Sequence, residues 1–306
     1  MLDTDGRQSE FSAFGRVKAE ALAWIDPGGV VLLGGGETFL LTRAGRTPDC
    51  ALLGAGPHNV RTAVGLGANR LAVVSGGESV GGVLKGAQVS LWELFPYCRK
   101  LWDGISPQMN PQSLTVGNLE GHCCVLISVY KSAILEPVVR LRPWIYRLEG
   151  ERLVAVWKGS SFSQPYVAAT FADVCPENAS DEVCALELTR GGQRQITIYR
   201  WRGFVMEGIA QSAPASFGDT IKHAQATDGE TALYVWLGGQ YGQIVGLGVP
   251  QWPKNSLARL EPRYQTRQMP RPVAWDIGRF AGRPAAYVLS ERGKLIRIPL
   301  VACAGE

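Results

Sequence analysis

The chain has 306 residues, a net charge of +4, 37 glycines and 18 prolines. With 46% hydrophobic and 19% charged residues, this composition excludes a disordered chain and favours a globular protein rich in turns rather than in long helices. The positive charge is mild and is not gathered into one basic stripe, so we expect no nucleic-acid partner. The longest apolar runs are far shorter than the ~20 residues of a membrane helix, so we expect a soluble protein that does not span a membrane.

Six short apolar runs, each followed by a glycine-rich turn, recur along the chain. Each predicts a β-strand that enters a hairpin, because glycine adopts the positive φ that tight turns require. In chain order the runs are GVVLLGGGE, RLAVVSGGE, CCVLISVYKS, VCALELTRGG, ALYVWLGGQ and AAYVLSERGK. A second run follows each turn: TFLLTR, VSLWEL, WIYRLEG, ITIYRW, QIVGLG and KLIRIP.

One residue of each second run serves as an anchor from which the spacing of the repeat is measured. The anchors are Phe39, Leu91, Ile145, Ile198, Ile244 and Ile296, at intervals of 52, 54, 53, 46 and 52 residues. Another strand candidate precedes each hairpin: LAWID, VRTAVGL, SLTVGNL, YVAATFADV, IKHAQATD and PVAWDIG. A fourth follows five of them: CALLGAG, RKLWDG, RLVAVWKG, FVMEGIA and LARLEPRY. Four short strands per repeat of about 50 residues, with no helical periodicity, predict the blades of a β-propeller.

The predicted fold is therefore an all-β, six-bladed β-propeller of four-stranded blades, forming a single domain over residues 1–306. The similar segments LWDGIS and VWKGSS, with Trp102 and Trp157 55 positions apart, are then the ends of equivalent fourth strands. The sixth repeat ends at VACAGE before a fourth strand. Because an open blade leaves unpaired backbone groups on its edge, we expect residues 9–17 to supply the missing outer strand of the last blade. Seven irregular blades are the alternative.

Seven cysteines occur without a CxxC pair, which indicates neither a zinc ribbon nor a complete disulfide framework. Cys175 and Cys184 bracket the polar segment PENASDEV. They form either a disulfide, in an oxidising compartment, or two buried thiols. The three histidines, His58, His122 and His223, fall in different repeats and predict no metal site.

Two segments of the second half carry a family resemblance: PYVAATFADV followed by VCALELTRGGQRQITIYRW, and PVAWDIGRFAGRPAAYVLSERGKLIRI. They resemble the FG-GAP or VCBS type of repeat, the propeller unit of integrin α chains and many bacterial surface proteins. In that family a DxDxDG loop between the first two strands binds calcium. The corresponding loops here, such as DVCPENASDE and ATDGET, do not keep three carboxylates at alternate positions, so we expect no metal and no other cofactor.

The resemblance implies a periplasmic or secreted protein. The first residues, MLDTDGRQSEFSAFGR, contain no basic region followed by an apolar stretch, and they predict no secretory signal peptide in this chain.

Catalytic motifs are missing from the sequence. GxSxG and HExxH do not occur, and no pair of carboxylates is singled out by its spacing, so a protein that is not an enzyme is favoured. Most tryptophans fall in predicted strands, where a large flat side chain packs between blades.

Polar residues stand at equivalent positions at the start of the first strand in five repeats, where they would ring one mouth of the axial channel. These candidate binding residues are His58, Asn110, Gln164, Asp219 and Gln268. The stretch LARLEPRYQTRQMPRP places an arginine at every fourth position, and its prolines exclude a continuous helix. The four arginines form a candidate basic patch for an anion or an acidic partner, or else a solvated strand and loop. They are Arg259, Arg263, Arg267 and Arg271.

A large rigid scaffold without a catalytic constellation favours a non-catalytic propeller that acts as a protein–protein interaction or assembly module. Such a protein would be an accessory subunit of a larger complex, with one or more protein partners. The alternative is a propeller that binds a glycan or small molecule at the channel mouth, as a lectin, hydrolase or lyase. Carboxylates and exposed aromatic residues converging on the mouth would favour the alternative, and an apolar rim patch would favour the interaction module.

Overall fold

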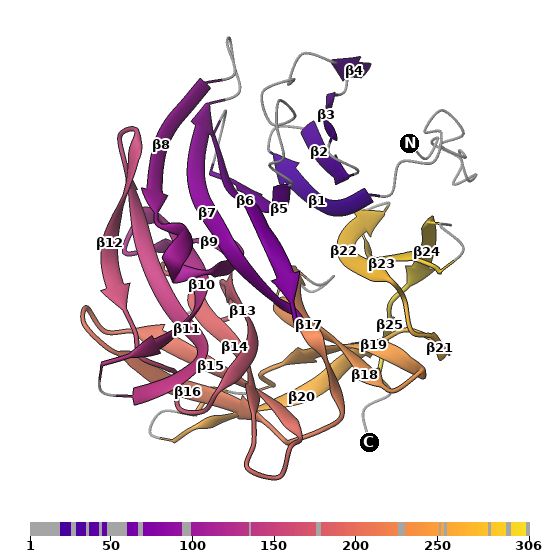
Figure 1. The fold of residues 1–306 in the computed structure, drawn as a ribbon. Coiled ribbons are helices and arrows are strands. Elements are labelled where there is room, and N and C mark those ends of the chain that lie inside the picture. The colour runs from indigo at the N-terminus through magenta and orange to yellow at the C-terminus, as the bar shows by residue number, and fades with distance from the viewer. Residues whose placement is uncertain are drawn as a thin grey trace. The chain divides into compact units, whose positions relative to one another are not determined.

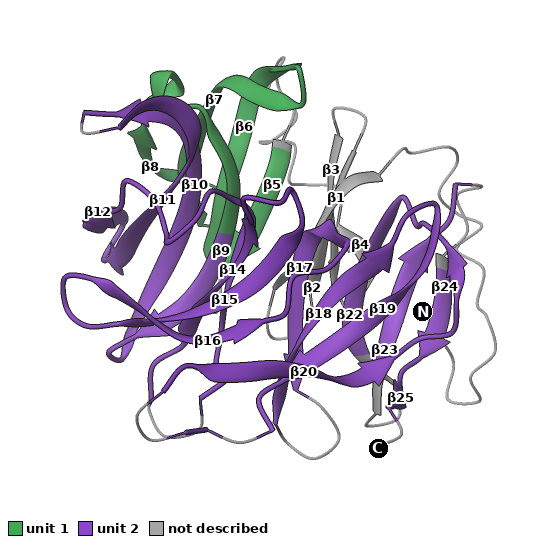
Figure 2. Cartoon of the chain, turned by 90° about the horizontal axis from the view of Figure 1, so that it is seen from below, with its two compact units in different colours: residues 1–114 green, residues 115–306 purple. Residues whose placement is uncertain are grey.

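The computed structural model describes most of the chain between residues 19 and 303. The described ranges are 19–25, 29–34, 37–42, 45–47, 60–66, 70–93, 99–134, 136–175, 179–225, 230–250, 252–253, 256–280, 283–291 and 295–303. Only the backbone is described for residues 19–60, 279–280, 283–284 and 295. The chain divides into two compact units, unit 1 (residues 1–114) and unit 2 (residues 115–306), coloured green and purple in Figure 2. The single domain over residues 1–306 stays a prediction.

The described residues form β-strands, with one short 3-10 helix, η1 (Pro107–Met109), and no α-helix (Figure 1). Unit 1 holds two antiparallel sheets, each with its strands in sequence order. The first consists of β1 (Ala19–Ile25), β2 (Gly29–Gly34), β3 (Glu37–Thr42) and β4 (Gly45–Thr47). The second consists of β5 (Val60–Gly65), β6 (Arg70–Val80), β7 (Val83–Glu93) and β8 (Arg99–Ile105). In the first sheet the fourth strand, β4, precedes the predicted segment CALLGAG, which lies outside the described residues.

Three sets of strands in unit 2 continue the same pattern of four antiparallel strands, and the final set has three described strands. The third sheet consists of β9 (Pro111–Leu119, which begins in unit 1), β10 (His122–Ala133), β11 (Glu136–Glu149) and β12 (Arg152–Lys158). The next two sets are β13 (Tyr166–Ala172), β14 (Glu182–Leu188), β15 (Arg194–Trp201) and β16 (Met206–Ser212), and then β17 (Phe217–Gln225), β18 (Thr231–Gly238), β19 (Tyr241–Gly248) and β20 (Ala258–Gln265). The final sheet consists of β22 (Ala274–Phe280), β23 (Arg283–Leu289) and β24 (Leu295–Pro299). The short strands β21 (Met269–Pro270) and β25 (Val301–Ala302) pair with β19 and β20.

The anchor residues of the sequence repeat hold equivalent positions in the sheets. Each anchor lies on the third strand of its set, opposite a residue of the second strand. The pairs are Leu32–Phe39, Ala72–Leu91, Leu126–Ile145, Cys184–Ile198, Trp236–Ile244 and Val288–Ile296. The spacing of about 50 residues therefore is the spacing of a structural unit, as predicted.

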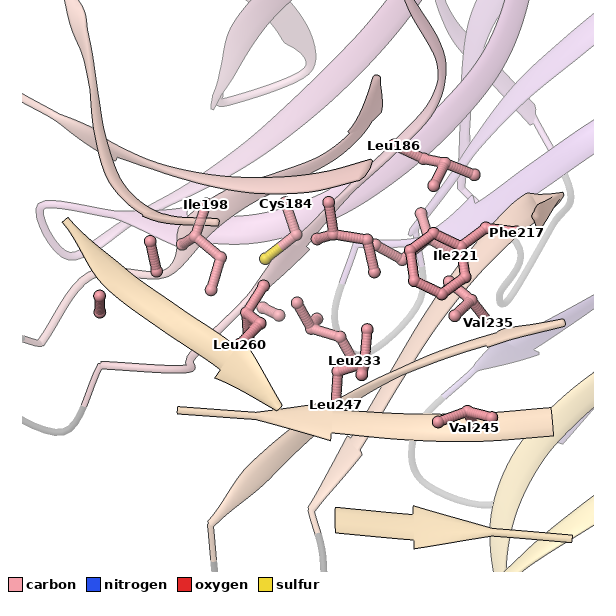
Figure 3. Packing of buried hydrophobic residues seen from close by; sticks show 14 residues of the cluster. Cys184, Leu186, Ile198, Phe217, Ile221, Leu233, Val235, Val245, Leu247 and Leu260 are labelled. Atoms are coloured by element: carbon pink, nitrogen blue, oxygen red, sulfur yellow. The ribbon is translucent and has the colours of Figure 1, made fainter. Parts of the chain in front are cut away.

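The fourth and fifth sets are not separate sheets. Their outer strands β16 and β20 pair in parallel, with Ala210 opposite Ala258 and Ser212 opposite Leu260. One continuous sheet of ten strands results. Ala210, Ala258 and Leu260 are also buried in the apolar cluster between these two sets. Figure 3 shows this cluster, to which the fourth set contributes Cys184, Leu186 and Ile198 and the fifth set contributes Leu233, Leu247 and Leu260.

Aromatic residues fill the space between neighbouring sheets of unit 2. Trp157 of β12 meets Trp201 of β15 edge-on, with ring centroids 6.3 Å apart, and Phe162 stacks on Tyr199 at 4.8 Å. Trp236 is buried in the next cluster along the chain. The predicted use of tryptophan for packing between blades is confirmed for Trp157, Trp201 and Trp236.

The final sheet has three strands in the part of the chain that the structure describes. Residues 9–17, the predicted fourth strand, lie outside that part, and their role stays a prediction. Among the described residues, no helical segment has the length and apolar character that crossing a bilayer requires.

Candidate functional site

The predicted channel-mouth residues lie in different surroundings. His58 lies outside the described residues. Asn110 follows η1 in the left-handed conformation (φ 47°), and its Oδ1 accepts a hydrogen bond from the backbone N–H of Gly86 at 3.0 Å. Asn110 therefore has a structural role inside unit 1. Gln268 is exposed.

Gln164 lies beside a buried carboxylate. Its backbone N–H donates to Glu187 Oε1 at 3.1 Å, and Glu187 is fully buried. Tyr199 Oη and Thr197 Oγ1 donate to the two oxygens of the same carboxylate, each at 2.6 Å. Burial, followed by the hydrogen bond to Glu187, raises the pKa of Tyr199. The arrangement fixes the turn that leads into β13, and it leaves the backbone of Gln164 in a structural role.

Polar side chains on the first strands of successive sets meet one another in unit 2. Thr115 of β9 and Thr170 of β13 have their hydroxyl oxygens 3.1 Å apart. Thr170 Oγ1 lies 3.4 Å from His223 Nδ1 on β17. These contacts span 55 and 53 residues, about one repeat each. The repeat length was the signal in the sequence that could have paired them.

His223 is exposed to solvent, yet the surrounding protein lowers its pKa by desolvation. Asp181 and Asp276 act in the opposite direction, and Lys222 adds to the lowering. With its pKa lowered, the imidazole is neutral at pH 7, and it can donate one hydrogen bond and accept another.

A shallow cleft of about 350 Å³ lies along β17, the strand that also carries His223. Its lining combines two cations and a carboxylate with aromatic and apolar surface. The lining residues are Asp219, Thr220, Lys222, Trp236, Arg271, Pro272, Val273, Ala274 and Trp275. Asp219, predicted at the channel mouth, and Arg271, predicted in the basic patch, come together here: Arg271 Nη2 lies 3.4 Å from Asp219 Oδ1.

The four arginines of the predicted basic patch do not act alike. Arg263 lies 3.6 Å from Glu230, and Arg271 is paired with Asp219. Arg259 and Arg267 are exposed, and Arg259 is opposite Gln211 at the β16–β20 junction. Because two of the four charges face carboxylates, the surface is less cationic than the sequence indicates.

The hairpin of β10 and β11 carries exposed apolar residues on a fixed backbone. Ile134 is fully exposed, and Val138 and Val139 are 59% and 53% exposed. The register shifts between Lys131–Arg140 and Ala133–Glu136, so that residues 137–139 form a bulge opposite a single residue. Beneath this bulge lies Arg142, only 1% exposed.

The guanidinium of Arg142 donates hydrogen bonds to β10, to β11 and to the turn after β12. Its Nε donates to the carbonyl of Lys131 at 3.1 Å, and its Nη2 donates to those of Glu136 and Val138 at 3.1 and 2.6 Å. Its Nη1 donates to Ser160 O and to the Glu136 carboxylate, which also pairs with Arg140. The hydrogen bond from Arg142 is the main cause of the lowered pKa of Glu136.

Two carboxylates where the loop between β13 and β14 ends, Asp181 and Glu182, are held by protein donors; this loop corresponds to the calcium loop of FG-GAP or VCBS repeats. Glu182, 1% exposed, accepts from the N–H groups of Val174 and Cys175 at 3.2 and 3.1 Å. Asp181 Oδ2 accepts from the N–H of Asn118 at 2.7 Å. Within the described ranges, no three His, Cys, Asp or Glu side chains gather as metal ligands.

The structure has Cys175 and Cys184 as buried thiols, the second of the two predicted alternatives. Cys175 Sγ accepts a hydrogen bond from Arg200 Nη2, whereas Cys184 lies in the apolar cluster between the fourth and fifth sets. These separate surroundings account for two thiols in place of a disulfide. Burial raises the pKa of Cys184 well above its ordinary value, which makes the thiol unreactive.

No family model and no curated protein matches the sequence. Among solved structures, the chain is similar to a protein from Lactobacillus plantarum, with 13% identity over 90% of this chain and 79% of that chain and a TM-score of 0.50. It is also similar to Saccharomyces cerevisiae Sqt1, with 10% identity over 95% of this chain and 87% of Sqt1 and a TM-score of 0.52. These neighbours are β-propellers. The fold is that of a β-propeller. At such low identity the likeness extends to fold alone, and the FG-GAP or VCBS resemblance stays a prediction.

Proposed function

We propose that the chain is a six-bladed β-propeller closed by residues 9–17 and that it acts as a non-catalytic protein-interaction module. Its docking element would be the β10–β11 hairpin. The observation that carries the proposal is the apolar bulge of this hairpin, exposed to solvent and bound from beneath by the buried Arg142.

Exposed apolar residues on this hairpin favour a protein contact. Ile134, Val138 and Val139 lie within six residues of one another and gain free energy when a partner removes them from water. Scattered single apolar residues on a surface need no explanation, but this group stands at the end of the two longest strands that the structure describes.

Arg142 reduces the cost of binding. Burying a guanidinium costs free energy unless its N–H groups form hydrogen bonds. Here Nε and Nη2 of Arg142 donate to backbone carbonyls of the hairpin. The bulge is therefore held in one conformation before a partner arrives, so less conformational entropy is lost on association.

The charges around the bulge indicate the chemistry of the partner. Lys131, Arg140 and Arg142 outnumber the single carboxylate, Glu136, that pairs with two of them. We expect a partner surface with apolar side chains at its centre and carboxylates around them, because opposite charges on the rim speed and orient association.

The test compares capture of partners by the full-length tagged protein and by the I134S/V138S/V139S variant, from the native cells. We expect one stoichiometric protein to be captured by the wild type and to fall at least tenfold with the variant. The control, L257S/V301S, changes residues that are 51% and 54% exposed elsewhere and should leave capture unchanged. Capture should also weaken as salt is added. Equal capture by both proteins, or the absence of a stoichiometric partner, would overturn the proposal.

Closure of the ring is tested separately. Within the part of the chain that the structure describes, the final sheet has three strands, which supports a fourth strand from elsewhere in the chain. Deletion of residues 1–17 should speed amide hydrogen exchange in β24, since its outer edge would lose its partner. Unchanged exchange in β24 would contradict closure by this segment without affecting the docking element.

A further inference from the structure

We propose that the cleft between β17 and the segment before β22 is a binding site for a neutral saccharide, with a sugar ring against Trp275. This site goes beyond the proposed protein contact, because the cleft and the β10–β11 hairpin share no residue.

The charges of the cleft cancel. Arg271 faces Asp219 at 3.4 Å, and Lys222 faces Asp276 at 3.6 Å. An anionic ligand would gain from the cations and lose to the adjacent carboxylates, so no net charge is selected. A neutral ligand avoids that conflict.

Both ion pairs are long and exposed to solvent, so their side chains keep hydrogen-bonding capacity for a ligand. The side chains of Arg271 and Asp219 are 52% and 63% exposed, and those of Lys222 and Asp276 are 37% and 49% exposed. A guanidinium has five N–H donors and a carboxylate about four acceptor sites. A ligand rich in hydroxyl groups can donate to Asp219 and accept from Arg271 at once.

Apart from Thr220, the remaining lining residues are apolar or aromatic. Trp275 is partly exposed and Val273 is 65% exposed. Trp236 also contributes to the lining, but it is buried, with 2% of its surface exposed. Its indole N–H is bonded to the carbonyls of Gly238 and Gly239 at 3.1 and 3.3 Å, so it offers a ligand no hydrogen-bond donor. A pyranose ring combines C–H faces with hydroxyl edges, and it matches aromatic surface next to polar groups.

The wall of the cleft is held in place before a ligand binds. The N–H of Arg271 donates to Gln240 O at 2.8 Å, and the N–H of Val273 donates to Leu289 O at 2.9 Å. Strand β21, directly before this wall, pairs with β19. A fixed wall lowers the entropic cost of binding a small ligand. The volume of about 350 Å³ lies at the lower end of ligand sites, and it suits a small saccharide or the end residue of a longer one.

The test is binding of the full-length protein to an array of neutral, sialylated and sulfated saccharides, followed by titration of the best neutral probe with tryptophan fluorescence. We expect a neutral saccharide to bind and D219N to weaken it at least tenfold. The control R267Q changes an exposed arginine outside the cleft and should leave the affinity unchanged.

Two variants of Trp275 test its role, and the second of them serves as a control if the loss of the side chain disturbs folding. W275A should abolish binding, and W275F should restore most of it, because phenylalanine keeps an aromatic face. Binding of sialylated or sulfated saccharides alone, no binding to any neutral saccharide, or equal affinity of D219N and wild type would each overturn the proposal. The I134S/V138S/V139S variant should bind the saccharide normally, so this site and the hairpin can fail independently.

Discussion

The indole of Trp157 lies against the Cα atom of Gly159, two residues further along the chain. A Cβ added at Gly159 would stand 2.3 Å from Cη2 of that ring, and one added at Gly104 would stand 1.5 Å from Cζ2 of Trp102. Trp102 is opposite the anchor Leu91, and Trp157 is opposite the anchor Ile145. The similarity of LWDGIS and VWKGSS thus has a physical cause: at equivalent places in two sheets, a tryptophan folds over a glycine that must lack a side chain.

Replacing Gly159 by alanine should therefore destabilise the protein. The new methyl group would overlap the indole of Trp157, and we expect the free energy of unfolding to fall by about 1–3 kcal/mol, measured as a lower midpoint in urea. Gly239→Ala is the control, because a Cβ there meets no atom within 4 Å and its φ is not positive. We expect its effect to stay within about 0.5 kcal/mol. A W157L background should relieve the penalty at position 159, and an equal effect of the two alanine substitutions would contradict the contact.

The order of strands could be predicted because each hairpin repeats one local pattern, an apolar run, a glycine-rich turn and a second run. The fourth strands are less regular. Strand β4 is only Gly45–Thr47, three residues without an apolar side chain. The predicted fourth strand, CALLGAG, lies outside the described residues and stays a prediction. The parallel pairing of β16 with β20 could not be predicted from a local sequence pattern either, because it joins the outer strands of different sets.

Two residues of the cleft were predicted as site residues, but their proximity was not. Asp219 and Arg271 were each identified, but as members of two separate sets, a channel mouth and a basic patch. They are 52 residues apart, which equals the interval between the anchors Ile244 and Ile296. Asp219 lies on the first strand β17, and Arg271 lies just before the first strand β22. Residues one repeat apart come together in this region, and this rule could have paired them. The docking hairpin could not be found in this way, since its bulge depends on the side chain of Arg142.

Glu136 should make the stability of the hairpin depend on pH. Its pKa is lowered, chiefly by the hydrogen bond from Arg142. A lowered folded-state pKa contributes stability that is present above the ordinary value of about 4.3 and is lost as pH falls through the lowered one. We expect E136Q to be less stable than the wild type at pH 7, and the difference to shrink as pH falls below about 4.3.

The measurement for Glu136 is the urea midpoint of both proteins between neutral and acid pH. The control is E207Q, which removes half of the exposed pair Arg202–Glu207; such pairs contribute about 0–1 kcal/mol. If E136Q and wild type differ by the same amount at every pH, the lowered pKa of Glu136 is wrong.

Replacing Glu187 by alanine should be among the more costly single changes. Tyr199, Thr197 and the backbone of Gln164 would all lose a buried acceptor, and we expect a loss of about 3–5 kcal/mol in urea unfolding. Tyr199→Phe removes one donor and leaves the carboxylate two others, and it also removes the acceptor of the Ser163 N–H. Its cost should be about 1–2 kcal/mol. If both changes cost the same, the three hydrogen bonds do not converge on Glu187 as the structure has them.

His223 should titrate below the usual histidine value of about 6.5, because desolvation by the surrounding protein is the largest influence on its pKa. The midpoint can be followed by NMR of the imidazole Cε1–H, assigned with H223Q. Its neighbours allow a matched pair of variants with opposite signs. D181N removes a negative charge that favours the imidazolium and should lower the midpoint further, whereas K222Q removes a positive charge and should raise it.

The same lowering links His223 to stability. Because the folded-state pKa lies below the unfolded one, this histidine contributes stability that is present above about pH 6.5 and is lost as pH falls through the folded value. As pH falls, the wild type should therefore lose stability relative to H223Q, and the urea midpoints of the two proteins measure this loss. Shifts of the NMR midpoint in the same direction for D181N and K222Q would mean that His223 does not lie between these two charges, and that the first strands of neighbouring sheets do not meet as described.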